Sequence, residues 1–370
     1  DVSAPILLWL QGGPGASSMF GLFIENGPFQ ITKHCKIECR KYSWTKSFSM
    51  LYIDQPVGTG FSFTDDDKGY AKNLNESTDN VYNALNQFFL MFNELSRNEF
   101  YVTGESYAGK FAPALAYKIQ NDINSKINLK GIAVGNAFVD PISYLDLNSL
   151  LYEMSLIDKQ QRRLFEAKEM EIKELIKQEQ LSEAFKKYEI LFRNSCNGKS
   201  LFFNFTGYNS YYSLIHQNEE CGSERLSRFL NKCYVKKQLH VGNRTYKGDV
   251  KSNFQVVTSF MKDYFLSAKE MLSVVMDNYR VMLYSGNLDI IVAPVFNNRF
   301  LNNLRWKHRD EYLKAERKIW RFGKEENIVG YIKNVANFYE VIIRNSGHMV
   351  PLDKPEAAFE MIQKFVNNQL

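Results

Sequence analysis

The chain has 370 residues, of which 45% are hydrophobic and 14% aromatic, enough for one large hydrophobic core or for a core with a cap. Its formal net charge is only +5, and its basic residues are scattered among acidic ones, so a nucleic-acid-binding surface is not indicated. No apolar run approaches the roughly 18 residues that a membrane-spanning helix needs.

Six short apolar runs, rich in β-branched and aromatic residues, are predicted to be strands. In chain order they cover residues 5–10, 49–54, 100–103, 131–134, 281–284 and 340–344. Because the runs are continuously apolar and alternate with helix-like stretches, they indicate a mostly parallel sheet that is covered on both faces. The predicted fold class is therefore α/β.

A long insertion is expected between the fourth and fifth runs, because the roughly 145 residues between them far exceed a crossover helix. We expect residues 140–250 to form an inserted, largely helical cap, and residues 1–139 and 251–370 to form the core. Tyrosine and phenylalanine residues between 201 and 212 could line a pocket for the substrate's side chain, but a core role is favoured. One helix is predicted by apolar residues at spacings of three and four, namely Leu181, Ala184, Phe185, Tyr188, Leu191 and Phe192.

A glycine-rich loop, residues 11–15 (QGGPG), follows the first predicted strand. Consecutive glycines let backbone N–H groups approach a developing oxyanion, and Gly13 is the expected donor from this loop. A phosphate-binding loop is the rival interpretation, but neither of the usual phosphate-loop spacings of glycine and lysine occurs here. A plain structural turn is the remaining alternative.

Ser106 is the candidate nucleophile. It lies in residues 104–109 (GESYAG), between a predicted strand and a helix-like segment. Such a corner strains the backbone at its central residue, so it needs small neighbours, which the two terminal glycines supply. Ala108 stands where the usual Gly-x-Ser-x-Gly pattern has its last glycine. The N–H of Tyr107, the residue after the serine, is the expected second donor to an oxyanion.

An acid and a base are expected to follow the serine in the order Ser, Asp, His. Asp289 comes just after the predicted strand 281–284, and His348 comes just after the strand 340–344. Both lie where parallel sheets place their functional loops, at the carboxyl ends of strands. His348 would accept the serine proton, and Asp289 would orient the imidazole and stabilise its charged form. The sequence thus predicts an α/β-hydrolase fold with a Ser106–His348–Asp289 triad.

Four segments together resemble the serine carboxypeptidases, and among them most closely the vitellogenic-like members. The segments are residues 9–15 (WLQGGPG), 54–62 (DQPVGTGFS), 104–109 (GESYAG) and 347–351 (GHMVP). They span nearly the whole chain in the family's order. The resemblance implies release of single residues from peptide carboxyl termini at acidic pH, with peptides that have a free carboxyl terminus as substrates and without any metal or cofactor.

The resemblance also implies a site for the substrate's terminal carboxylate. In the family, two carboxylic acids share a proton there, and the matching positions are Glu25 and Glu105. Two nearby carboxyls cannot both ionise at low cost, so one pKa rises and a neutral acid can donate to an anion. Gln11 and Gly12 match the remaining positions of this carboxylate site.

The sequence departs from the family pattern in three places. Gln11 replaces the more usual asparagine, which lengthens an amide expected to touch the substrate carboxylate. Ala16 replaces a frequent cysteine, so a disulfide common in relatives is absent. The strands and signal that precede Trp9 in relatives are not part of this sequence, which starts at Asp1 directly before a strand-like run. This start is expected to reflect either processing or a shortened form.

Cysteines and glycosylation acceptors favour the secretory pathway, with a lysosomal or secreted protein as the expectation. The acceptors are Asn75, Asn204 and Asn243, each in an Asn-x-Ser/Thr triplet. The cysteine count is odd and no Cys-x-x-Cys spacing occurs, so the pairing is not determined. The cysteines are Cys35, Cys39, Cys196, Cys221 and Cys233. The chain is compatible with a homodimer.

Two other functions stay open at this point. The same triad suits an acyltransferase or an esterase, which would transfer or hydrolyse other acyl groups. The hydrolase scaffold also suits a non-catalytic binding or protective partner, since fold alone does not determine function.

Overall fold

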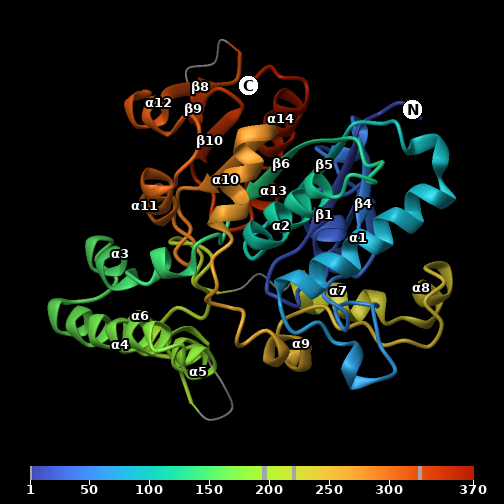
Figure 1. Ribbon diagram of the computed structural model, residues 1–370. Coiled ribbons are helices and arrows are strands. Elements are labelled where there is room, and N and C mark those ends of the chain that lie inside the picture. Colours follow the sequence, from blue (N-terminus) through green and yellow to red (C-terminus); the bar gives the residue numbers. More distant parts are fainter. Residues whose placement is uncertain (1, 194–197, 219–221, 324–326) are drawn as a thin grey trace.

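The computed structural model describes residues 2–193, 198–218, 222–323 and 327–370 (Figure 1). Within these ranges an eight-stranded sheet runs through the centre, in the order β4-β1-β5-β6-β7-β10-β9-β8. Neighbouring strands from β4 to β10 are parallel, whereas β9 and β8 are antiparallel to their neighbours. The strands are β1 (Ile6–Leu10), β4 (Ser49–Tyr52), β5 (Phe100–Glu105), β6 (Leu129–Gly135), β7 (Arg280–Gly286), β8 (Lys318–Arg321), β9 (Ile328–Val335) and β10 (Phe338–Ile343).

The six runs predicted from the sequence are the six parallel strands, and the predicted α/β fold is confirmed. The edge hairpin of β8 and β9 was not predicted. Its strands are largely half-buried or exposed, so they lack the continuous apolar run that marks the central strands. A separate hairpin of β2 (Phe29–Ile31) and β3 (Ile37–Cys39) was also not predicted, because each strand has only three residues.

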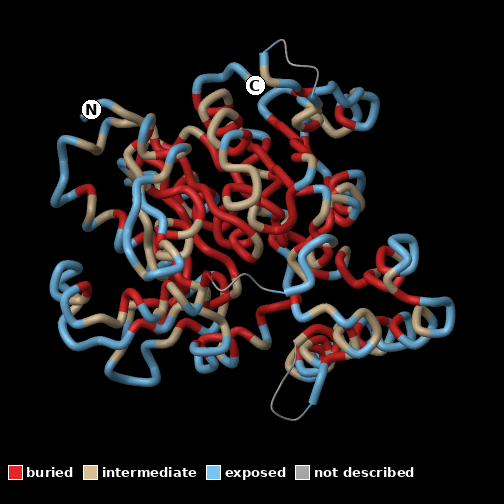
Figure 2. Tube along the Cα trace, turned by 180° about the vertical axis from the view of Figure 1, so that it is seen from behind, coloured by how far each residue is buried: buried red, intermediate tan, exposed pale blue. Residues whose placement is uncertain are grey.

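Helices cover both faces of the sheet, and the alternation of side chains along each strand decides which face each residue serves. Leu8 of β1 packs in the cluster that holds α1 (Leu74–Met91), α2 (Ala108–Asn121) and α10 (Lys269–Asn278). Its neighbours Leu7 and Trp9 pack in the opposite cluster, against α14 (Pro355–Val366). Figure 2 shows the resulting buried layer through the middle of the molecule.

The helices between β6 and α10 form two groups. In Figure 1, α3 (Leu147–Glu153), α4 (Lys159–Lys177), α5 (Leu181–Phe192) and α6 (Leu201–Thr206) lie together, away from α7 (Gly222–Leu230), α8 (Cys233–Gln238) and α9 (Phe254–Ser259). The first group continues the main core through Phe165 and Phe185. The second group packs through Phe229 against Phe23 of the short helix η1 (Gly21–Glu25). The cap boundaries at 140 and 250 stay a prediction.

The two ends of the segment between β6 and α10 lie side by side. The backbone N–H of Ala268 donates to the carbonyl of Val139 over 3.0 Å, at the point where the chain returns to α10. The remaining helices follow β7 and β10, and they are α11 (Pro294–Asn303), α12 (Arg309–Lys314) and α13 (Val350–Asp353). None of the helices in the described ranges combines the length and apolar character needed to span a bilayer.

Candidate active site

Ser106 lies in the turn between β5 and α2, as predicted. Its φ of +61° falls in the left-handed region, which non-glycine residues rarely adopt and which is typical of a nucleophile on a strand-to-helix corner. Two backbone hydrogen bonds hold this conformation, from Ser106 N to Gly135 O at 2.9 Å and from Phe138 N to Ser106 O at 2.8 Å. A Cβ at Gly109 would lie 2.4 Å from Phe138 N, so only glycine fits there.

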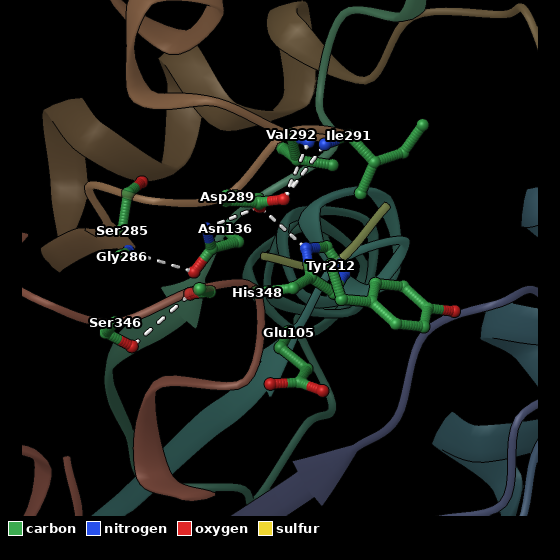
Figure 3. Close-up of polar contacts among 12 residues, drawn as sticks. Glu105, Asn136, Tyr212, Ser285, Gly286, Asp289, Ile291, Val292, Ser346 and His348 are labelled. Carbon is green, nitrogen blue, oxygen red and sulfur yellow. Dashed lines mark hydrogen bonds and ion pairs between the residues drawn. The ribbon is translucent and has the colours of Figure 1, made fainter. Parts of the chain in front are cut away.

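His348 and Asp289 form a buried acid–base pair at the carboxyl ends of β10 and β7. The His348 Nδ1 atom lies 2.7 Å from Asp289 Oδ2, and the two residues are only 3% and 1% exposed (Figure 3). The other oxygen, Asp289 Oδ1, accepts from the backbone N–H groups of Ile291 at 3.0 Å and Val292 at 3.3 Å. These bonds fix the carboxylate, which in turn fixes the ring so that Nε2 is left to accept a proton.

Asn136 supports the same pair and was missed by the sequence analysis. Its Nδ2 donates to Asp289 Oδ2 over 2.6 Å, and its Oδ1 accepts from Gly286 N over 3.3 Å (Figure 3). The available signal was its position directly after β6, the strand between those that lead to Ser106 and to Asp289. Within the described residues, no hydrogen bond joins the Ser106 hydroxyl to His348, as is common before a substrate is bound.

The glycine-rich loop packs directly onto the nucleophile turn. A Cβ at Gly12 would lie 2.7 Å from the Cβ of Ser106 and 2.8 Å from the backbone N of Tyr107, so any side chain would push the loop away. Among the described residues, no acceptor engages the backbone N–H of Gly13 or of Tyr107. The two N–H groups predicted to form the oxyanion hole are therefore both uncommitted.

Serines after the loop tie it to the end of β4. Ser18 Oγ donates to the carbonyl of Ile53 over 2.6 Å and accepts from the backbone N–H of Gln11 over 3.1 Å. Ser17 Oγ bonds Asp54 Oδ1 over 2.5 Å. The loop is thus held at both of its ends, by β1 before it and by the neighbouring strand after it.

Gln11 joins the two carboxyls that the resemblance singled out. Its Nε2 donates to Glu105 Oε1 over 2.6 Å and to Glu25 Oε1 over 3.2 Å. Its Oε1 accepts from Trp9 Nε1 over 2.7 Å, which fixes the orientation of the amide. Glu25 comes from η1 and Glu105 from the end of β5, so residues 80 positions apart in the chain share one amide.

Both carboxyls are buried, and their pKa values rise accordingly. Burial raises the pKa of Glu25 to about 7, against hydrogen bonds from Glu105 and Gln11 that favour its charged form. Burial raises the pKa of Glu105 well above its usual range, and the charge of Glu25 raises it further. Glu105 therefore stays protonated and can donate to Glu25 or to another anion.

The segment from Tyr211 to Leu214 bridges the loops that carry Asp289 and His348; we call it the strap. The backbone N–H of His348 donates to the carbonyl of Tyr212 in the strap over 2.8 Å. The backbone N–H of Leu214, also in the strap, donates to the carbonyl of Leu288 over 2.8 Å. The ring of Tyr212 also stacks on the imidazole, with 5.0 Å between ring centroids and 23° between planes (Figure 3). The core role favoured for the aromatic residues of this segment therefore does not apply to Tyr212, whose ring lies against His348.

The remaining candidate residues lie away from this centre. Asn75, Asn204 and Asn243 are all exposed, the first two in helices and the third in a turn. Cys35, Cys39 and Cys233 are unpaired within the described part of the chain. Cys196 and Cys221 lie outside the described residues.

The chain matches the serine carboxypeptidase family over residues 1–368. It is 44% identical to the venom serine carboxypeptidase of Apis mellifera, over 99% of this chain and 79% of that one. It is 42% identical to the probable serine carboxypeptidase CPVL of Mus musculus, over 98% of this chain and 76% of that one. It is 40% identical to the vitellogenic carboxypeptidase of Aedes aegypti, over 98% of this chain and 77% of that one.

The fold also matches a solved structure, the prohormone-processing carboxypeptidase Kex1 of Saccharomyces cerevisiae. The TM-score is 0.83 at 25% identity, over 99% of this chain and 84% of that one. The likeness therefore extends over the insertion as well as the core.

Proposed function

This chain belongs to the serine carboxypeptidase family and is a serine-type carboxypeptidase, and we propose that it works at acidic pH through an acyl-enzyme on Ser106. The observation that carries the assignment of roles is the buried pair of Glu25 and Glu105, joined by Gln11 and placed next to the nucleophile. Peptides with a free carboxyl terminus are the substrates that this arrangement suits.

Acylation begins when Ser106 Oγ attacks the carbonyl carbon of the last peptide bond. His348 Nε2 takes the serine proton, and Asp289 stabilises the imidazolium that forms. The negative charge moves to the carbonyl oxygen, which the N–H groups of Gly13 and Tyr107 are placed to receive. The imidazolium then gives its proton to the leaving nitrogen, and the terminal amino acid departs.

Deacylation repeats these steps with water. His348 takes a proton from the water as it attacks the acyl-enzyme carbonyl, and the same two N–H groups bind the second oxyanion. Collapse of the intermediate returns the proton to Ser106 Oγ and releases the shortened peptide. The triad thus ends in its starting protonation state.

Selection of the terminal residue depends on the substrate carboxylate. The N–H of Gly12 and a protonated Glu105 are the proposed donors to it. The amide of Gln11 already donates to Glu105 and Glu25, so it reaches the substrate carboxylate only by giving up one of these bonds. A neutral carboxyl pair accepts this anion, whereas an ionised Glu25 repels it. Because the pKa of Glu25 is about 7, binding is expected to weaken as the pH rises past neutrality.

The test compares two N-blocked substrates, a dipeptide with a free carboxylate and an amino-acid ester without one, from pH 4.5 to 8. For the unaltered protein, the dipeptide KM should rise roughly tenfold per unit above about pH 7, because each unit ionises Glu25 further. In Glu25→Gln, the dipeptide KM should be higher at acidic pH and nearly independent of pH. The increase in dipeptide KM that Glu25→Gln causes, relative to the unaltered protein, is therefore smaller at neutral pH than at acidic pH.

Glu169→Gln is the matched control for this experiment. Glu169 is another buried carboxyl whose pKa burial raises to about 7, but it bonds Leu147 N and Asn148 in the insertion. Its substitution should leave the pH dependence of KM unchanged. Equal losses on both substrates at every pH in Glu25→Gln would remove Glu25 from carboxylate recognition.

We further propose entry into the secretory pathway and a lysosomal or secreted location. The support is exposure of the three acceptor asparagines, Asn243 in a turn, together with the family membership. Protein from secreting cells should shift on a gel after peptide-N-glycosidase treatment, and no shift would contradict glycosylation. A homodimer remains a proposal, which sedimentation of the purified protein would check.

A further inference from the structure

Tyr284, which no step above uses, lies level with Glu105 across the sheet. Glu105 of β5 pairs with Gly135 of β6, and Gly135 pairs in turn with Tyr284 of β7. Side chains alternate along a strand, so Glu105 points to the same face as Tyr101, four residues earlier. Tyr284 and Tyr101 pack in the same cluster below the sheet, so Tyr284 and Glu105 share that face.

Gly135, the residue between them, lets the ring of Tyr284 cross the middle strand. A Cβ at Gly135 would lie 2.5 Å from Tyr284 Cε2, 2.7 Å from Cζ and 2.9 Å from the hydroxyl oxygen. The outer end of the ring therefore lies over β6, in space that any other residue would fill. This position brings the hydroxyl towards β5 and the carboxyl of Glu105.

The hydroxyl of Tyr284 is buried and has no hydrogen-bond partner among the described residues. The Oε2 atoms of Glu25 and Glu105 bond no other described residue, although the two carboxyls hydrogen-bond each other through the proton of Glu105. The exposed fractions of the three residues are 0%, 0% and 2%, so bulk water does not reach them. An unsatisfied buried polar group costs roughly 1–3 kcal/mol, so the hydroxyl of Tyr284 needs a partner, and the carboxyl pair has lone pairs left with which to accept.

A single water molecule is the partner that fits these atoms. No direct hydrogen bond joins the Tyr284 hydroxyl to either carboxyl, so the contact is longer than a hydrogen bond allows. Buried waters typically make about three hydrogen bonds, and here the hydroxyl of Tyr284 can donate to the water while a free lone pair of each carboxyl accepts from it. A water is small enough to bridge such groups without displacing Gln11 from its bonds to the pair.

The hydroxyl of Tyr284 acts as a donor in this arrangement. Burial raises the pKa of Tyr284 well above its usual range, and the charges of Glu105 and Glu25 raise it further. The group is therefore never ionised under working conditions. The neutral hydroxyl can donate a hydrogen bond that stabilises a negative charge on the carboxyl pair, and it carries no negative charge of its own.

We propose that Tyr284 is a positioning residue of the carboxyl pair, whose hydroxyl donates through one buried water to Glu25 and Glu105. This inference rests on the proposed function of the pair in binding the substrate carboxylate. Its consequence is that Tyr284 stabilises the ionised form of the pair and so sets the pH at which peptide binding fails. The other groups that act on the pair are Arg40, Tyr52, Asp289 and His348, and they are unchanged by a substitution at Tyr284.

Tyr284→Phe tests the proposal, because it removes the hydroxyl and keeps the ring. Without the donor, the pair ionises less readily, so the rise of the dipeptide KM should move to higher pH by about 0.5–1 unit. This shift should be confined to the substrate with a free carboxylate. A high-resolution crystal structure should show a water bonded to Tyr284 and the pair, and its loss in the variant.

Tyr339→Phe is the matched control. Tyr339 lies on the same face of the sheet, on β10, and its hydroxyl bonds Asn368 instead of the pair. The Tyr339→Phe substitution should leave the pH dependence of the dipeptide KM unchanged. A shift of equal size in both variants, or no shift in Tyr284→Phe, would overturn the inference.

Glu105→Gln, measured in parallel, separates this inference from the function on which it rests. If Glu105→Gln weakens dipeptide binding and Tyr284→Phe leaves the pH dependence unchanged, only the role of Tyr284 is wrong. If neither variant alters dipeptide KM relative to the ester, the carboxyl pair itself has no part in substrate binding, and both proposals fall.

Discussion

The amide of Asn136 bonds the acid of the triad on one side and the backbone of Gly286 on the other. Asn136 has a φ of +42°, a conformation that asparagine tolerates better than most residues. It follows β6, a strand that supplies no group to the reaction itself. Its role is to hold Asp289 so that the ring of His348 keeps one orientation and one tautomer.

Asn136→Gly should lower kcat about tenfold, because Asp289 loses a charge-assisted hydrogen bond of roughly 1.5–3 kcal/mol. Glycine adopts positive φ without strain, so the turn itself is kept. The loss should be the same for the dipeptide and the ester, with KM nearly unchanged. Steady-state kinetics on both substrates checks this, and a loss restricted to the dipeptide would contradict a role through Asp289.

At the scale of elements, the strap makes the insertion part of the catalytic apparatus. One short segment bonds the loop of Asp289 through Leu214 and the loop of His348 through Tyr212. The stacked Tyr212 ring also shields one face of the imidazole. The relative position of acid and base therefore depends on a segment that lies outside the sheet.

Tyr212→Leu should lower kcat/KM at least tenfold on both substrates, because an aliphatic side chain cannot stack on the imidazole. Tyr212→Phe should stay within about threefold of the unaltered protein, since it keeps the ring. The rate of Ser106 labelling by a fluorophosphonate probe should follow the same order. Equal rates in the leucine and phenylalanine variants would show that stacking has no role.

The central strands, and the loops on which the triad is proposed, could be predicted from the sequence for a physical reason. Buried parallel strands are continuously apolar, and the loops at their carboxyl ends carry Ser106, Asp289 and His348. The carboxyl pair came from resemblance instead, because Glu25 and Glu105 meet only through tertiary folding. Nothing local marks a glutamate as buried.

The residues that were missed act through contacts that have no period or spacing in the sequence. Asn136 is a single polar residue after a strand, and Tyr212 is one aromatic residue among many in its segment. The hairpin of β8 and β9 at one side of the sheet was missed because its residues are largely half-buried or exposed and so form no apolar run. Such features depend on what lies across the fold, which only the structure supplies.

At the scale of the whole molecule, buried carboxyls make stability depend on pH. Burial raises the pKa values of Glu25 and Glu169 to about 7 from an ordinary 4.5, and it raises that of Glu105 well above the same ordinary value. Between these values the folded protein holds more protons than the unfolded chain, so the free energy of unfolding falls as pH rises. The pKa of Lys110, lowered by burial to about 8, adds no slope in this window.

We therefore expect a Tm at least a few degrees lower at pH 8 than at pH 5, measured by thermal unfolding at constant ionic strength. Glu169→Gln should reduce this difference without altering the pH dependence of the dipeptide KM. Glu25→Gln should reduce both the difference in Tm and the pH dependence of the dipeptide KM. A Tm that is equal at the two pH values, or higher at pH 8, would contradict the assignment of buried, protonated carboxyls.

The hydrogen bond between Val139 and Ala268 has a consequence for protein engineering. Because the segment between Val139 and Ala268 begins and ends at one point beside the sheet, its replacement by the corresponding part of a relative requires no change in the path of the rest of the chain. Chimaeras joined at these two residues should therefore fold around an intact sheet. A chimaera should be active only if the donor segment also contacts the loops of Asp289 and His348, as the strap does. A chimaera that folds but is inactive would therefore identify the loss of these contacts.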